Sequence, residues 1–143
     1  QRPSGQQDEY VFPPPAAAAA WEPEELRPEA HLRRQERDLT SDAVTLVIED
    51  DFGKVRDRDH GIVSGSVARE RWTILPDDPL SASGACHWTD ELEREGLRLR
   101  TETRCKMTCD AAFFHLTARI EAYENDELIY ERDVTDSIER QFM

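Results

Sequence analysis

The stretch LRLRTETRCKMTC, residues 97–109, alternates between two kinds of side chain at every position. Leu97, Leu99 and Met107 share one parity with Thr101, Thr103 and the two cysteines, whereas the arginines, Glu102, Lys106 and Thr108 share the other. A period of two is the pattern of a β-strand that buries one face and exposes the other. The stretch therefore predicts a long amphipathic strand.

The same alternation recurs on both sides of this stretch. Residues 113–123 place Phe114, Leu116 and Ile120 on one face and His115 and Tyr123 on the other. Further runs of apolar and β-branched residues are bounded by turn-forming residues. Together they predict about six strands, at residues 44–49, 60–74, 84–92, 97–109, 113–123 and 127–134.

The connections between these runs have hairpin length, which predicts antiparallel strands in meander order. Long strands with one charged face predict a curled sheet or an up-and-down barrel, because an open flat sheet exposes its edges. The expected fold class is therefore all-β.

Glycine and aspartate mark the expected breaks in the strands. Gly53 predicts a turn that ends the first strand, and Gly61 and Gly65 favour a bulge or tight bend in the second. Asp77 and Asp78 stand between two prolines, which favours a role as turn formers over one as paired acid and base.

The first part of the chain has a different composition. Six of the eight prolines fall within the first 28 residues, where an Ala-rich run follows three consecutive prolines. Pro-rich segments prefer extended geometry and bury little surface. We therefore expect residues 1–42 to form a linker with a short helical turn at residues 28–37, and residues 43–143 to form the antiparallel β domain.

Composition excludes several classes of protein. The 143 residues include 31 acidic and 18 basic side chains, a formal net charge of −13, so a nucleic-acid partner is not expected. No apolar run approaches the roughly 18 residues of a membrane span, so no membrane partner is expected. Cys86, Cys105 and Cys109 form an odd set without a C-x-x-C pair, which favours free thiols and a cytoplasmic location. The first residue, Gln1, suggests a processed protein or a piece of a longer one.

Motifs for catalysis are not evident in the sequence. The string around Ser64 is G-x-x-S-G, whereas the nucleophile elbow of α/β-hydrolases requires G-x-S-x-G followed by a helix. Cys105 and Cys109 are four residues apart on one strand, about 13 Å, which is too far to share one zinc ion without a bend. We therefore predict no catalytic residue, no metal ligand and no cofactor in this chain.

One group of residues suggests a binding pocket. Trp88, His115 and Tyr123 lie on or next to predicted strands and would line the interior of a closed sheet around a small apolar ligand. Each is also compatible with an ordinary half-buried strand position. Charged residues such as Glu102 and Arg104 are expected to pair across neighbouring strands.

Several strings resemble the C-terminal part of CocE/NonD-type serine hydrolases, a group that includes X-Pro dipeptidyl-peptidases and cocaine-esterase-like enzymes. They are Ile74-Leu75-Pro76-Asp77-Asp78-Pro79-Leu80-Ser81-Ala82, Cys86-His87-Trp88-Thr89, Arg100-Thr101-Glu102-Thr103-Arg104 and the run from Phe114 to Glu124. The resemblance spans most of residues 43–143. None of the positions of the family's Ser-Asp-His triad has a counterpart in this chain.

The resemblance implies a non-catalytic accessory domain of a larger serine hydrolase, which serves packing, oligomer contacts or substrate access. Its expected partner is the upstream hydrolase domain of the same polypeptide, and an exposed apolar patch would favour a homodimer of the isolated chain. The alternative is a stand-alone β-barrel module that binds a small apolar ligand. A third hypothesis, an independent enzyme that uses His or Asp pairs, lacks a recognisable constellation.

Overall fold

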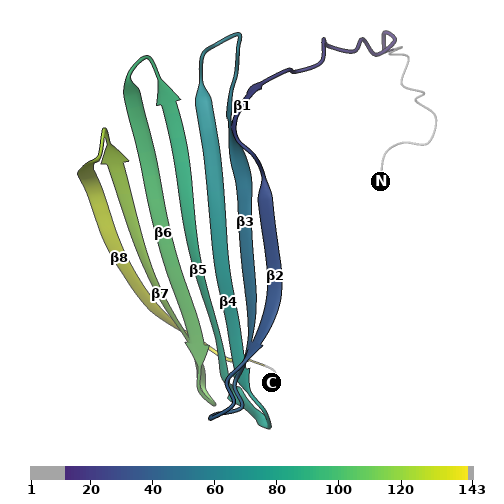
Figure 1. The fold of residues 1–143 in the computed structure, drawn as a ribbon. Helices are drawn as coiled ribbons and strands as arrows, with labels where there is room; N and C mark the ends of the chain where they lie inside the picture. Colours follow the sequence, from purple (N-terminus) through teal and green to yellow (C-terminus); the bar gives the residue numbers. More distant parts are fainter. Residues whose placement is uncertain (1–11, 142–143) are drawn as a thin grey trace, which may run out of the picture.

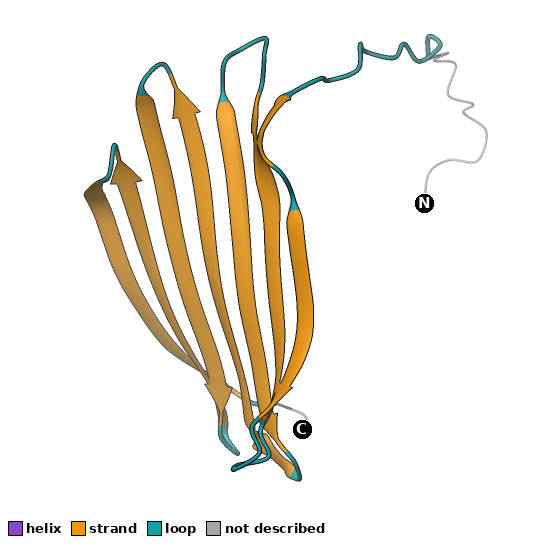
Figure 2. Cartoon of the chain, in the orientation of Figure 1, coloured by secondary structure: helices purple, strands orange, loops and turns teal. Residues whose placement is uncertain are grey.

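The computed structural model describes residues 12–141, and every regular element in this range is a β-strand (Figures 1 and 2). The prediction of an all-β antiparallel fold is confirmed, but the strand count of about six is too low. The eight strands of the described range are β1 (Glu24–Arg27), β2 (Ala30–Arg37), β3 (Val44–Arg56), β4 (Val63–Leu75), β5 (Asp78–Arg94), β6 (Leu97–Cys109), β7 (Phe113–Glu124) and β8 (Glu127–Glu139).

The strands form one antiparallel sheet in the order β1-β3-β4-β5-β6-β7-β8, with β2 also paired to β3. From β3 to β8 each strand pairs with its neighbour in sequence, so the predicted meander is confirmed. β2 and β1 share the outer edge of β3, because β2 pairs with its first half and β1 with its end. The described residues form a single layer (Figure 1).

The prediction that the sheet curls or closes into a barrel is wrong. β8 and β2 lie at opposite sides of an open sheet (Figure 1) and do not pair with each other. Each of these two edge strands carries a surplus of one sign of charge, which disfavours pairing between two like edges. The outer strand β2 carries mainly basic side chains and β8 mainly acidic ones: Arg33, Arg34 and Arg37 against Glu127, Glu131, Asp133, Asp136 and Glu139.

Residues with positive φ close the tight turns. Asp77 has φ of 58° in the β4–β5 turn, so its predicted role as a turn former is confirmed. Glu95 and Gly96 close the β5–β6 hairpin, and Asn125 and Asp126 close the β7–β8 hairpin, all with positive φ. Positive φ at both central residues matches the right-handed twist of the flanking strands.

Gly53 lies at a bulge within β3, and the turn predicted at this position is wrong. β3 continues to Arg56, with a register shift between Asp51 and Lys54. Gly53 has φ of 79°, a conformation that glycine adopts without steric cost. Opposite the bulge, a Cβ atom at Gly65 would lie 3.1 Å from the Gly53 carbonyl oxygen. Two glycines therefore let the two backbones approach closely where the extra residues are accommodated.

The segment expected to be a linker contributes two strands to the sheet. β1 is only four residues long and is flanked by Pro23 and Pro28, which cannot donate ladder hydrogen bonds. The helical turn predicted at residues 28–37 is wrong, because most of this segment pairs with β3 as β2. Cross-strand hydrogen bonding outweighs the helix propensity of its Arg, Glu and Gln residues. Residues 1–11 of the expected linker lie outside the described residues.

The buried core of this layer is small. Among the described residues, the apolar side chains with almost no exposure are Val47, Val63 and Ala68. Larger apolar side chains remain partly exposed because, within residues 12–141, no second layer lies over the sheet. The side chains exposed on the two faces of the sheet are therefore the surfaces available for binding or chemistry.

Candidate functional site

One face of the sheet, the apolar face, gathers large hydrophobic side chains from β3 to β8. The cross-strand registers place Leu46, Trp72, Gly84, Met107 and Leu116 in one row across β3 to β7. The large side chains of the apolar face are not covered, since Trp72 on β4 is 45% exposed and Ile138 on β8 is 52% exposed. Other members of the apolar face are Ile48, Phe52, Ile74, Trp88, Leu92, Leu97, Leu99, Phe114, Ile120 and Val134.

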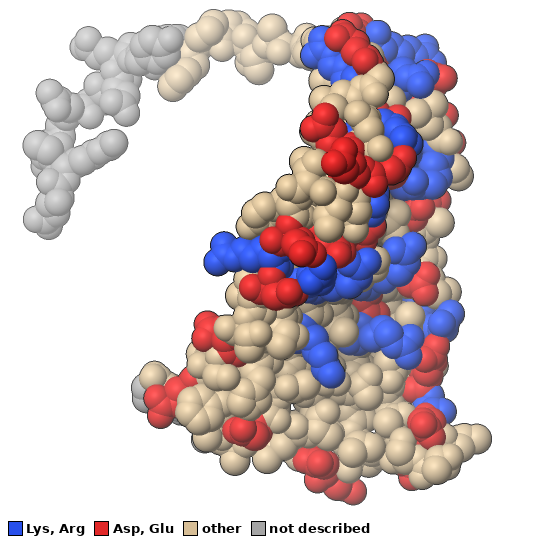
Figure 3. Space-filling model, turned by 90° about the vertical axis from the view of Figure 1, so that its left-hand side faces the viewer, with Lys and Arg blue, Asp and Glu red and all other residues tan. Residues whose placement is uncertain are grey.

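The apolar face is hollowed near the lower end of the sheet as drawn in Figure 1. One cavity of about 390 Å³ and a second of about 250 Å³ lie side by side there, and Trp72, Gly84 and Met107 line both. The Trp72 ring lies directly over Gly84, where a Cβ atom would be 2.5 Å from Cζ3 of the indole. Seen from the β8 side, the lower part of the molecule is largely uncharged (Figure 3). The hollow is therefore an apolar trough floored by backbone.

The predicted pocket residues Trp88, His115 and Tyr123 do not come together. Trp88 lies on the apolar face, where it stacks on Phe52 with ring centroids 5.9 Å apart. His115 and Tyr123 lie on the opposite face, at the two ends of β7. The physical reason is strand parity, because Trp88 shares its face with the even-numbered residues of β7. Tyr123 instead lies beneath Arg100, whose guanidinium carbon is 3.9 Å from the ring centroid.

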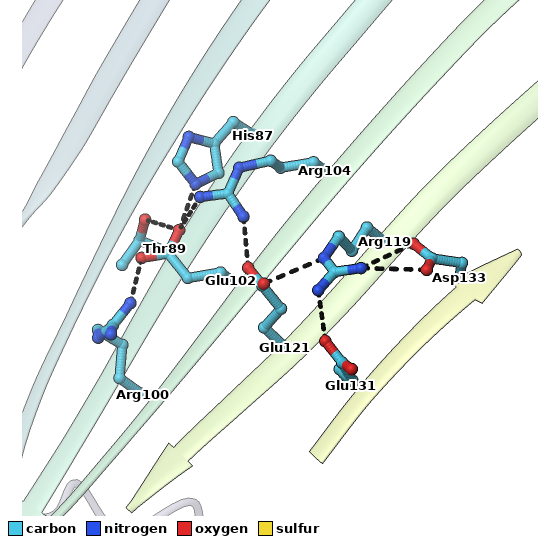
Figure 4. Close-up of polar contacts among 9 residues, drawn as sticks. All are labelled: His87, Thr89, Arg100, Glu102, Arg104, Arg119, Glu121, Glu131 and Asp133. Carbon is cyan, nitrogen blue, oxygen red and sulfur yellow. Dashed lines mark hydrogen bonds and ion pairs between the residues drawn. The ribbon is translucent and has the colours of Figure 1, made fainter. Parts of the chain in front are cut away.

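The opposite face, the charged face, carries two cross-strand rows of polar side chains (Figure 4). Residues directly opposite one another often have like charge, such as Arg104 with Arg119 and Glu102 with Glu121. Directly opposite like charges destabilise a sheet. The two rows, in strand order β5 to β8, are His87, Arg104, Arg119 and Asp133, and Thr89, Glu102, Glu121 and Glu131.

Ion pairs between the two rows relieve this repulsion. Arg104 reaches Glu121 at 2.7 Å, and Arg119 reaches Glu121 at 3.0 Å. Arg119 also pairs with Asp133 at 3.0 Å and with Glu131. The expected pairing of charges across neighbouring strands is confirmed. The charged face is thus balanced within the sheet, as suits a face in contact with water.

Glu102 is the buried centre of this network, with 8% of its surface exposed. It accepts hydrogen bonds from Arg100 at 2.5 Å, from Thr89 at 3.1 Å and from His87. Burial alone raises the pKa of Glu102, but the hydrogen bonds from His87, Arg100 and Thr89 outweigh it and hold the pKa below its ordinary value. A carboxylate held in its charged form suits a structural ion pair and not a general acid.

A Ser–His–Asp arrangement on the charged face was not predicted from the sequence. His115 contacts Asp110 Oδ2 through Nε2 at 2.8 Å and Ser137 Oγ through Nδ1 at 3.1 Å. Asp110 also accepts the backbone N–H groups of Ala112 and Phe113, which closes the β6–β7 turn. The side chains of His115 and Asp110 are 42% and 55% exposed, and Ser137 is exposed as well. The arrangement therefore ties the turn to β8, without the sheltered environment that nucleophilic catalysis requires.

Ser64, the nearest match to a hydrolase nucleophile, lies on the apolar face. Its cross-strand neighbours are Val55 on β3 and Leu92 on β5, neither of which can act as a base.

Comparison with protein-family models, curated proteins and solved structures finds no match to the chain.

The described part of the chain shows no cluster of side chains suited to bind a metal ion. Within residues 12–141, no group of three or more His, Cys, Asp or Glu side chains is arranged to hold a metal ion. Each of the four histidines instead contacts a carboxylate: His31 with Asp50, His60 with Asp57, His87 with Glu102 and His115 with Asp110. In the same range, no helix is long and apolar enough to cross a membrane.

Proposed function

We propose that this chain is a non-catalytic accessory segment of a larger serine hydrolase of the CocE/NonD type. Its apolar face would dock against the upstream hydrolase part of the same polypeptide, in the cytoplasm. The observation that carries the proposal is the contrast between the faces. Large apolar side chains are exposed on one side, and charges are paired with one another on the other.

A β-sheet with one apolar face is stable in water when a second layer covers that face. Complete burial of a large apolar side chain contributes about 1.5–3 kcal/mol relative to leaving it exposed. Side chains such as Trp72, Met107 and Ile138 gain only part of this in the single layer, because each remains more than a third exposed. A covering layer would therefore add stability at many positions at once.

The sequence resemblance supports the same assignment. The string from Phe114 to Glu124, which resembles the C-terminal part of these hydrolases, lies within β7. Its apolar positions, including Leu116 and Ile120, lie on the apolar face. The apolar positions of the string are thus among those that a covering layer would contact, and the segment would serve packing, oligomer contacts or substrate access.

A docking experiment tests this proposal. The chain is co-expressed with the polypeptide encoded directly upstream, and co-purification is expected. Met107→Glu adds a charge to the trough and should abolish co-purification, whereas Thr135→Glu, on the charged face and outside both cavities, should not. Circular dichroism confirms that both variants fold. If the chain does not co-purify, or if both variants behave alike, the proposed docking face is wrong.

The chain alone provides a second test. We expect it to bind a hydrophobic dye such as ANS and to dimerise with rising concentration, because its apolar face is exposed. We expect no turnover of p-nitrophenyl esters or X-Pro amides. A strict monomer that does not bind the dye would count against the exposed face. Turnover lost in Ser64→Ala or Ser137→Ala would contradict a non-catalytic role.

The trough supports a second candidate function, a module that binds a small apolar ligand. Its larger cavity of about 390 Å³ exceeds the roughly 300 Å³ at the lower end of ligand pockets. The ligand would contact Trp72 and Met107, and not the three residues predicted from the sequence. Saturable quenching of tryptophan fluorescence at one ligand per monomer, lost in Met107→Glu, would favour this function over docking.

A further inference from the structure

We infer that Cys86 and Cys105 form a thiol pair that oxidation converts to a disulfide joining β5 to β6. The two residues lie directly opposite each other in the antiparallel register. Directly opposite residues in antiparallel strands have Cα atoms about 4.5–5.5 Å apart. This separation falls within the range of about 4.4–6.8 Å that a disulfide spans.

The side chains of the pair also share one environment. Both lie on the apolar face, are half-buried and line the cavity of about 390 Å³. Burial raises the pKa of the Cys86 thiol, and the charge and hydrogen bonding of Cys105 raise it further. The directly opposite register on one face therefore brings the two thiols to neighbouring positions, so we expect little backbone rearrangement when they are joined.

Cys109 provides an internal control on the same strand. It lies four residues beyond Cys105, which corresponds to about 13 Å along a strand. Its Sγ is 3.7 Å from the carbonyl oxygen of Leu80, and its cross-strand partner on β7 is Phe114. The geometry therefore singles out one pair among the three cysteines.

The oxidant for this reaction is a low-molecular-weight disulfide such as oxidised glutathione. One cysteine thiolate attacks the small disulfide, forms a mixed disulfide and releases one small thiol. The second cysteine thiolate then attacks the protein sulfur and releases the other small thiol. The protein loses two electrons and two protons, and the small disulfide gains them. The raised pKa of Cys86 makes the reaction faster at alkaline than at neutral pH.

This pair is independent of the proposed function. A layer docked on the apolar face would bury both sulfur atoms. We therefore expect oxidation only when the apolar face of the chain is uncovered. The disulfide would hold β5 and β6 in register without changing the charged face.

Oxidation of the reduced chain tests the inference. The chain is incubated with oxidised glutathione at mildly alkaline pH and analysed by thiol titration, intact mass and peptide mapping. We expect titratable thiols to fall from three to one, with a mass loss of two hydrogens and a peptide linking Cys86 to Cys105. Cys109→Ser should form the same link, whereas Cys86→Ser and Cys105→Ser should stop at a glutathione adduct or remain reduced.

Three outcomes would overturn the inference. They are retention of all three thiols, a stable glutathione adduct on the wild-type chain, and a link that includes Cys109. The wild-type measurement requires no substitution, so a variant that fails to fold does not affect it. Circular dichroism before and after oxidation verifies that the link forms in the folded sheet.

Discussion

Glu102→Gln removes the charge at the centre of the charged face and keeps the shape of the side chain. The glutamine would retain one carbonyl oxygen but would turn an amide N–H₂ group toward donors on His87, Arg100 and Thr89. We expect this change to destabilise the fold more than any other single carboxylate-to-amide change on this face.

The magnitude follows from burial and from the number of partners. Breaking a fully buried ion pair costs about 3–5 kcal/mol. The partners of Glu102 are less buried, since the Arg100 side chain is 33% exposed and that of Arg104 is 48% exposed, so both can recover water. Hydrogen bonds to charged groups contribute about 1.5–3 kcal/mol. We therefore expect a loss of about 2–3 kcal/mol in the free energy of unfolding.

Glu131→Gln is the matched control, because it removes one charge from the same network at its exposed end. The Glu131 side chain is 55% exposed, and its partner Arg119 keeps Glu121 and Asp133. Exposed pairs contribute about 0–1 kcal/mol. Urea unfolding at neutral pH, followed by circular dichroism, gives both values. Equal losses in the two variants would refute the argument that burial of Glu102 determines its contribution.

Three further predictions concern the trough, the bulge in β3 and the β6–β7 turn. Gly84→Ala should displace the Trp72 ring and cost about 1–3 kcal/mol, and an unchanged near-ultraviolet circular dichroism spectrum would contradict this. Gly53→Ala should cost about 1–3 kcal/mol in urea unfolding, because alanine at φ of 79° is strained and its Cβ would lie 2.9 Å from the Arg27 carbonyl oxygen. The pKa of Asp110 is lowered from 3.8 to about 2, mainly by His115. Its stabilising effect should therefore be complete above about pH 4 and disappear as the pH falls toward 2. Asp110→Asn should weaken the acid-induced loss of stability, measured as the urea midpoint against pH.

The alternation of residues was enough to predict the strands from β3 to β8. In β6 and β7 every second side chain lies on the same face. Parity alone therefore places Leu97, Met107 and Leu116 on one face and Arg104 and Arg119 on the other. Turn residues such as Asp77 and Asn125 mark the hairpins for a physical reason, because they tolerate positive φ.

The remaining features depend on contacts that alternation does not encode. β2 is an outer strand whose side chains are mostly exposed. Its sequence does not alternate between apolar and polar residues, so its pairing with β3 could not be predicted from the sequence. The prediction that Trp88 and His115 line one pocket was wrong. Whether two residues on β5 and β7 share a face depends on the registers of β5 with β6 and of β6 with β7, which the alternation within each strand does not give. Closure was expected because an open sheet exposes its edges, but the sheet is open, with a basic surplus on β2 and an acidic surplus on β8 that disfavour only the pairing of like edges.

The connectivity of the meander also determines how the chain can fold. Every pairing from β3 to β8 joins strands that follow one another in sequence, so each hairpin closes only a short loop. Short loops have a small closure entropy, and isolated hairpins form within about 1–10 μs. The sheet can thus grow by zippering from any hairpin, and loss of β8 would remove one row of contacts while leaving the pairings from β3 to β7 intact. The opposite edge is shorter, since β1 has 4 residues and β2 has 8 against 13 in β8. Fraying from the edge formed by β1 and β2 is accordingly the lowest-energy opening that this topology allows.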